Sequence, residues 1–175
     1  MILKILSDKE LSIYKHVFLI EGTMQEKTQK LRGLGVFDEY KEIYNEYLTV
    51  LKASDNETEK AEALKRITFL SWHHMIEPSC FTGIWQLDSD AIHTAYQMVD
   101  NNLKHKKIDS EFNWMLSYYS ANRWTILMHS EKEMNTLSTF VKNIDLTKLY
   151  LPTVDVLKTT MKDRGQMGEY FRTVS

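Results

Sequence analysis

Apolar side chains recur along this chain at spacings of three and four residues, the period of an α-helix that packs on one side. The clearest stripe lies between Val36 and Ala53, where large side chains share one helical face. They are Phe37, Tyr40, Ile43, Tyr44, Tyr47, Leu48 and Leu51. Strict alternation of apolar and polar residues, which would indicate a strand, is missing over any useful length. The pattern therefore predicts an all-α protein.

The first helix start is indicated by a capping box, in which an N-cap Ser or Thr is followed three residues later by Glu. Ser7 and Glu10 have this spacing, and they predict a helix that begins at Ser7 and ends near Glu21. The same spacing rule assigns its buried face. That face comprises Leu11, Tyr14, Val17 and Phe18.

Two further capping boxes follow. Thr23 and Glu26 predict a short helix that is mostly exposed, because the residues after them are polar. Ser54 and Glu57 predict a long helix. It should end ahead of Pro78, because proline disfavours helical backbone in the residue before it.

The second half of the chain has helix starts near Ser89, Ser110 and Ser130, and Pro152 suits the first turn of a final helix. Glycines at 165 and 168 predict an irregular C-terminal tail from about residue 165. The whole pattern predicts about seven helices in a single domain that spans residues 1–175.

Short connections between successive helices favour antiparallel neighbours, and we expect an irregular antiparallel multi-helix bundle. A HEAT-like α-α superhelix is the alternative, since helix pairs begin near Val36, Ser89 and Glu131. Their uneven spacing, without a residue pattern at a fixed period, favours the bundle.

Charge and composition exclude some partners. The 22 basic and 24 acidic residues give a net charge of −2, which does not favour binding to nucleic acid. No apolar stretch approaches the roughly 20 residues that a membrane span needs. Cys80 is the only cysteine, and the sequence from Met1 lacks the pattern of a signal peptide. We therefore expect a cytoplasmic protein with no membrane segment.

Candidate chemistry is concentrated at the end of the long predicted helix. His73, His74 and Glu77 could supply ligands to a divalent metal, because His73 and Glu77 are four residues apart and share a helical face. A further ligand would come from Cys80, Asp88, His93 or His129. In the alternative interpretation, these histidines only interact with unpaired carbonyls in the last helical turn. No zinc or di-iron signature accompanies them.

Aromatic residues form a second candidate site. If Phe112 and its neighbours at helical spacing face the core, then Trp114, Tyr118 and Trp124 point partly elsewhere, with Arg123 beside them. Aromatics and arginine are enriched at the centres of protein interfaces. A helix packed between two others would show the same pattern.

The segment 81–87 is unusually apolar for a connection and should pack on the helices. It is either a cover for the end of the bundle or, with Trp72 and His73, one wall of a ligand pocket.

No phosphate-binding loop, nucleophile elbow or dinucleotide fingerprint is present, which argues mildly against an enzyme. The leading hypothesis is a non-catalytic protein-interaction module that binds a protein partner or itself, with no cofactor predicted. The alternatives are a metal-dependent hydrolase and a small-molecule binder. The predicted ligand- or partner-binding residues are Trp72, Trp85, Trp114, Tyr118, Arg123 and Trp124.

Overall fold

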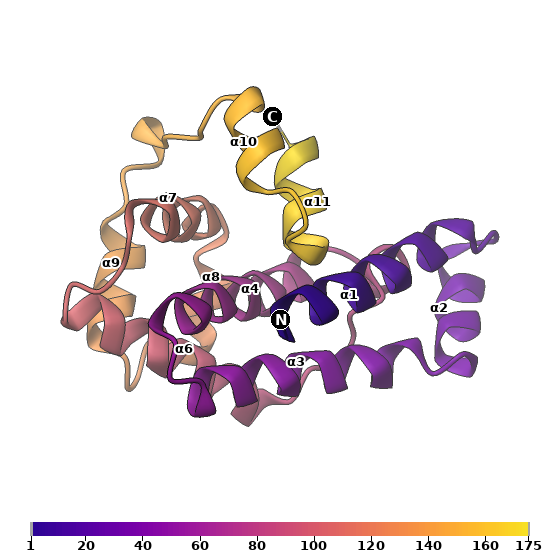
Figure 1. Cartoon of the computed structure of the whole chain (residues 1–175). Coiled ribbons are helices and arrows are strands. Elements are labelled where there is room, and N and C mark those ends of the chain that lie inside the picture. Colours follow the sequence, from indigo (N-terminus) through magenta and orange to yellow (C-terminus); the bar gives the residue numbers. More distant parts are fainter. Residues whose placement is uncertain (1, 175) are drawn as a thin grey trace. The chain divides into compact units, whose positions relative to one another are not determined.

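A computed structural model describes residues 2–174 and contains, over that range, eleven α-helices, two short 3-10 helices and no β-strand. The all-α class predicted from the sequence is confirmed (Figure 1). The predicted number of about seven helices is wrong. Short helices form where the sequence predicts a loop or a tail, and the helix predicted after Ser110 is interrupted at Ser120–Asn122.

The chain that the sequence predicts as one domain divides into two compact units. The first comprises residues 2–88 and 153–174 of the described chain, and the second comprises residues 89–152. The first unit contains α1 (Ile2–Leu19), α2 (Met24–Gly33), α3 (Val36–Ala53), α4 (Glu57–Ile76), α5 (Ser79–Thr82), α10 (Val154–Thr160) and α11 (Gly165–Thr173). The second contains α6 (Ser89–Lys104), α7 (Ser110–Tyr119), η1 (Ser120–Asn122), α8 (Trp124–Ser130), α9 (Asn135–Asn143) and η2 (Leu146–Lys148).

The core of the first unit is built on α3 and α4, which pack on each other more extensively than any other helix pair. All seven residues of the predicted α3 stripe are buried. The second half of α4 is buried on every side from Ala63 to His73. A helix surrounded in this way loses its amphipathic pattern, because no face is left for solvent.

Local signals place several helix ends correctly. Thr23 caps α2 in a complete capping box with Glu26. Asp109 caps α7 through its carboxylate and the backbone N–H of Phe112. The long helix ends at Ile76, ahead of Pro78. Its N-cap is Asn56, which accepts from two backbone N–H groups, and not Ser54 as predicted.

The prediction for α1 is wrong in its start and in its buried face. The helix begins at Ile2, so Ser7 and Glu10 lie inside it and form no capping box. The buried residues are Leu6, Ser7, Glu10, Ile13 and Val17. In contrast, Phe18 is 66% exposed. Because the helix starts earlier, the backbone N–H groups after Ser7 are bonded within the helix, and a cap there has no unpaired N–H group to satisfy.

The predicted irregular tail is also a helix. Residues Gly165–Thr173 form α11, with Met167 and Phe171 buried. Gly165 adopts a φ of +61°, which glycine tolerates. Because it is the first residue of α11, this conformation does not interrupt the turns that follow. This helix packs on α1 and, less extensively, on α4 (Figure 1).

The second unit is a cluster in which α6, α8 and α9 pack on one another. The carboxylate of Asp100 in α6 accepts the backbone N–H of Leu137, in the first turn of α9, at 2.7 Å. Asp100 thus satisfies one of the unpaired donors of that helix from outside it. Among the described residues, no helix combines the length and the hydrophobicity that a membrane span requires.

Candidate functional site

His73 points into an aromatic cluster in the first unit. Its ring lies 4.7 Å from Phe69 in a stacked geometry and 5.0 Å from Tyr170 edge to face, as centroid distances. The side chain is buried, and its Nδ1 atom has no hydrogen-bond partner in the structure. Burial, with a smaller effect of His74, lowers the pKa of His73 to about 3. His73 is therefore neutral at physiological pH.

The other two residues predicted as metal ligands are placed differently. His74 Nδ1 lies 2.7 Å from the carbonyl oxygen of Ser71, in the last turns of α4. Glu77 is the exposed C-cap residue of that helix. Within residues 2–174, no group of three His, Cys, Asp or Glu side chains is arranged to hold a metal ion. His74 thus interacts with a carbonyl of its own helix, ahead of the unpaired carbonyls of the last turn.

The apolar segment 81–87 packs on the first unit. Gly83 adopts a φ of +75°, and a Cβ atom there would lie 3.0 Å from Ile13 and 3.2 Å from Val36. Trp85 contacts Phe37, and the guanidinium of Arg32 lies 4.4 Å above its ring. The segment thus covers helices α1 and α3.

A small cleft of about 240 Å³ lies at the far end of this segment. It is lined by Lys41, Tyr44, Asn45, Gln86, Leu87 and Asp88. Trp72 and His73, which the sequence predicts beside such a pocket, do not line it, and Trp72 is 1% exposed.

The aromatic residues of the second unit divide into buried and exposed ones. Trp114 is 8% exposed and Tyr118 is half-buried, both in α7. The 3-10 segment then interrupts the helix, so Trp124 belongs to α8 and has a different environment. It is 54% exposed. The guanidinium of Arg123 donates to the carbonyl of Lys142 at 3.4 Å.

Trp124 has an exposed apolar neighbour one turn later. Met128 is 60% exposed, and residues four apart on a helix share one face. Tryptophan is among the residue types that are most buried on average. It is therefore unusual for a Trp and a Met on one helix face both to be exposed. These side-chain types are common in contacts between proteins.

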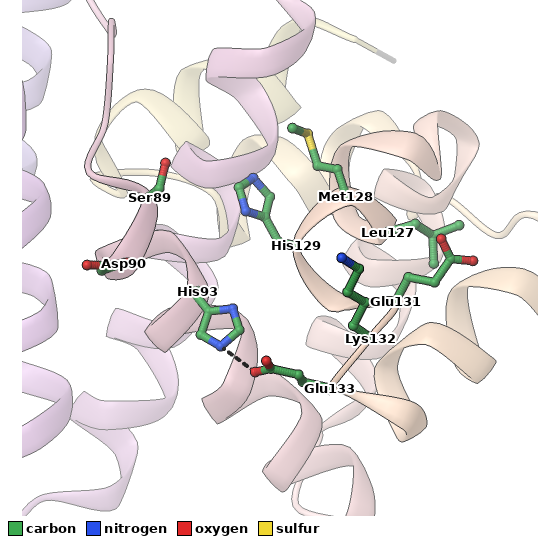
Figure 2. A pocket seen from close by; sticks show the side chains of 9 residues that line it. All are labelled: Ser89, Asp90, His93, Leu127, Met128, His129, Glu131, Lys132 and Glu133. Carbon is green, nitrogen blue, oxygen red and sulfur yellow. Dashed lines mark ion pairs between the residues drawn. The ribbon is translucent and has the colours of Figure 1, made fainter.

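Met128 also lines a cleft of about 460 Å³ within the second unit (Figure 2). Its walls come from the start of α6 and from the end of α8 with the residues after it. The lining residues are Ser89, Asp90, His93, Leu127, Met128, His129, Glu131, Lys132 and Glu133.

Acidic groups outnumber basic ones in this cleft. Asp90, Glu131 and Glu133 face a single lysine, Lys132. Figure 2 shows His93 and Glu133 pointing toward each other, with 3.1 Å between His93 Nε2 and the Glu133 carboxylate. Glu131 binds Lys142 at 2.7 Å. The cleft thus combines an apolar edge with carboxylates that are partly neutralised.

His129 forms part of the same wall. Its ring centroid is 5.8 Å from that of Tyr96. Burial, and to a smaller extent His93, lowers the pKa of His129 below its ordinary value. His129 is therefore uncharged at neutral pH and adds no positive charge to the cleft.

The sequence pattern does not predict a cluster of buried ionisable groups that lies in the first unit. Glu10 is 1% exposed and accepts hydrogen bonds from the hydroxyl of Tyr47 and, at 2.9 Å, from the backbone N–H of Gln166. The hydroxyl of Tyr40 is 3.5 Å from the same carboxylate. Burial raises the pKa of Glu10, and these hydrogen bonds oppose that effect.

Arginines connect this cluster to α4 and to the C-terminal residues. Arg66 contacts Tyr47 at 3.3 Å and binds Glu62 at 2.7 Å. Glu62 also accepts from Arg164 at 2.8 Å. The signal in the sequence was the position of Glu10, which interrupts an apolar stripe of Leu6, Ile13 and Val17 at helical spacing.

The geometry therefore supplies an exposed apolar surface at Trp124 and Met128 and a buried cluster around Glu10. Comparison with protein-family models, curated proteins and solved structures found no match to the chain.

Proposed function

We propose that the chain is a non-catalytic helical protein-interaction module whose contact surface is centred on Trp124 and Met128. The observation that carries the proposal is the exposure of both side chains on one face of α8, 54% and 60% respectively. Burying such a pair against a partner removes a large apolar area from water, worth about 25 cal/mol per Å². Tryptophan is also the residue type most often found to dominate binding energy in interfaces.

The cleft beside Met128 indicates the chemistry of the partner. Its carboxylates, at Asp90, Glu131 and Glu133, favour a partner segment with lysine or arginine side chains. The Trp124–Met128 face favours an apolar side chain next to those basic residues. A short amphipathic segment with both features would fit this surface better than an acidic or a wholly polar one.

The proposal is tested by selecting, from a random library of displayed peptides, those that bind the full chain. We expect the enriched peptides to combine apolar and basic residues. Binding of the strongest peptides, measured by fluorescence polarisation, should weaken at least tenfold on a W124A/M128S double variant, which corresponds to about 1.4 kcal/mol. Both positions are exposed, so this variant should fold normally.

The matched control is an M24S/L34S variant, which removes two side chains of similar exposure from the first unit. It should bind the selected peptides as the natural chain does. Peptides that bind the W124A/M128S variant with unchanged affinity would refute the proposed surface.

A further inference from the structure

Helix α1 carries a mostly apolar stripe that is partly exposed to solvent. Its residues are Leu11, Tyr14, Lys15, Phe18 and Leu19, at positions i, i+3, i+4, i+7 and i+8. Phe18 is 66% exposed and Leu19 is 80% exposed. The ring of Tyr14 packs edge to face on Phe18 at 4.7 Å. This spacing is that of helix faces that pack against other helices.

The stripe lines a groove of about 380 Å³. The sixth lining residue, Glu169, comes from α11. The groove therefore lies between α1 and α11, which pack on each other. Its lining is apolar except for one cation, Lys15, and one anion, Glu169.

The two charges have unequal local partners. Glu169 binds Arg172 in its own helix through Oε1 alone, at 2.9 Å. No ion-pair partner is found for Lys15 among residues 2–174. A ligand of this groove should therefore offer an anion near Lys15, an apolar surface for Phe18, and a cation near Glu169.

A second copy of this chain meets all three conditions, and we propose that the groove is a self-association site in which α1 of one copy packs against α1 of another about a two-fold axis. In a two-fold interface, residue i contacts residue j and j contacts i. Lys15 of each copy then faces Glu169 of the other, and the two exposed Phe18 side chains are buried together. The surface is self-complementary in charge, which an unrelated helix would match only by chance.

The net charge of the chain agrees with this arrangement. At −2 for 175 residues, two copies repel each other only weakly. The contact is centred on the few residues of one groove, so we expect a reversible dimer. The proposal is independent of the Trp124 surface, because all its residues belong to the first unit.

Charge reversal tests the pairing directly by sedimentation equilibrium of the full chain over a wide concentration range. The natural chain should dimerise reversibly. K15E places two like-charge contacts in the dimer, as E169K does, and each should weaken dimerisation about tenfold. An equimolar mixture of K15E and E169K restores opposite charges at both contacts, so the mixed dimer should be tighter than either variant's own dimer.

Controls separate this effect from general changes of charge or stability. K52E and E42K make the same charge changes on exposed positions of α3 and should leave dimerisation unchanged. F18S, at an exposed site, should fold normally and abolish the dimer. A natural chain that stays monomeric at every concentration would overturn the proposal, and so would a mixed dimer no tighter than the two variants alone.

Discussion

His73 shows how strongly one side chain can link the stability of this protein to pH. The imidazole contacts Phe69, Trp72 and Tyr170, and its Nδ1 makes no hydrogen bond with the described residues 2–174. Its folded-state pKa of about 3 lies far below the ordinary value of 6.5. Between these two values the unfolded chain binds a proton that the folded protein does not.

Stability should therefore be fully present above pH 6.5 and should be lost as the pH falls from 6.5 toward 3. The slope attributable to this group is about 1.4 kcal/mol per pH unit. Urea unfolding of the natural chain and of a His73→Phe variant at several pH values measures it. Phenylalanine keeps the aromatic packing, and the two proteins should diverge only below pH 6.5; parallel curves would contradict the burial of His73.

Glu10 should produce the opposite dependence. Burial raises its folded-state pKa above 4.5, so the folded protein retains a proton that the unfolded chain has already lost. The stability from this group is present below pH 4.5 and is lost as the pH rises through the folded-state pKa. A Glu10→Gln variant cannot titrate, and the natural chain should lose stability relative to it over that rise. A constant difference between the two proteins from pH 4 to pH 8 would disprove this coupling.

Glu10→Ala should be much more damaging than Glu10→Gln. Alanine leaves the hydroxyl of Tyr47 and the N–H of Gln166 buried without their acceptor. Removing one partner from such a buried cluster typically costs about 3–5 kcal/mol. Thermal unfolding measures the loss, and Glu46→Ala, which removes the partly exposed partner of Lys9, is the control. That surface ion pair is worth at most about 1 kcal/mol.

At the scale of elements, the joint between α1 and α11 depends on one glycine. Gly165 has a φ of +61°, and a Cβ atom would lie 2.7 Å from the carboxylate of Glu10. Gly165→Ala should therefore destabilise the protein by about 1–3 kcal/mol through backbone strain and the clash. Gly33→Ala is the control, because nothing lies within 4 Å of its added Cβ and its backbone is helical. The control should be neutral or stabilising by up to about 1 kcal/mol in thermal unfolding; equal losses would show that α11 is not held this way.

The same helices show which elements a sequence can predict. Thr23 and Asp109 each cap a helix through the residue three positions later, and Pro78 acts on its immediate neighbour, so these signals are complete within a few residues. The buried face of α1 is different. Glu10 is buried because Gln166, 156 residues later, donates to it, and no local pattern contains that partner.

The candidate site was predictable to a similar extent. Trp124 was identified from its phase relative to the apolar stripe, and it is exposed. Trp114 is buried although the same argument pointed it outward, because the buried residues of α7 lie on more than one side of that helix. The break at Ser120–Asn122 affects only the phase of the residues after it, including Trp124. The cleft joins residue 93 to residue 133 across a gap of 40 residues. Helical periodicity carries no information about such a pairing.

At the scale of the whole molecule, the sequence predicts one domain, whereas contacts divide the chain into two compact units. The two descriptions differ in how far a local defect spreads. In one cooperative domain, any destabilising change raises the opening of every helix, while separate cooperative units open independently. Hydrogen exchange of backbone amides distinguishes them, because it reports the opening free energy of each helix.

We predict that the units respond separately. Gly165→Ala strains the first unit only and should speed amide exchange in α1, α3 and α4, with the amides of α6, α8 and α9 unchanged. Leu137→Ala should do the reverse, because Leu137 is fully buried in α9 within the second unit and its loss costs about 2–5 kcal/mol. If each substitution instead accelerates exchange in both units equally, the chain unfolds as the single domain that its sequence predicts. The Trp124 surface and the α1 groove would then be lost together, with one free energy of unfolding.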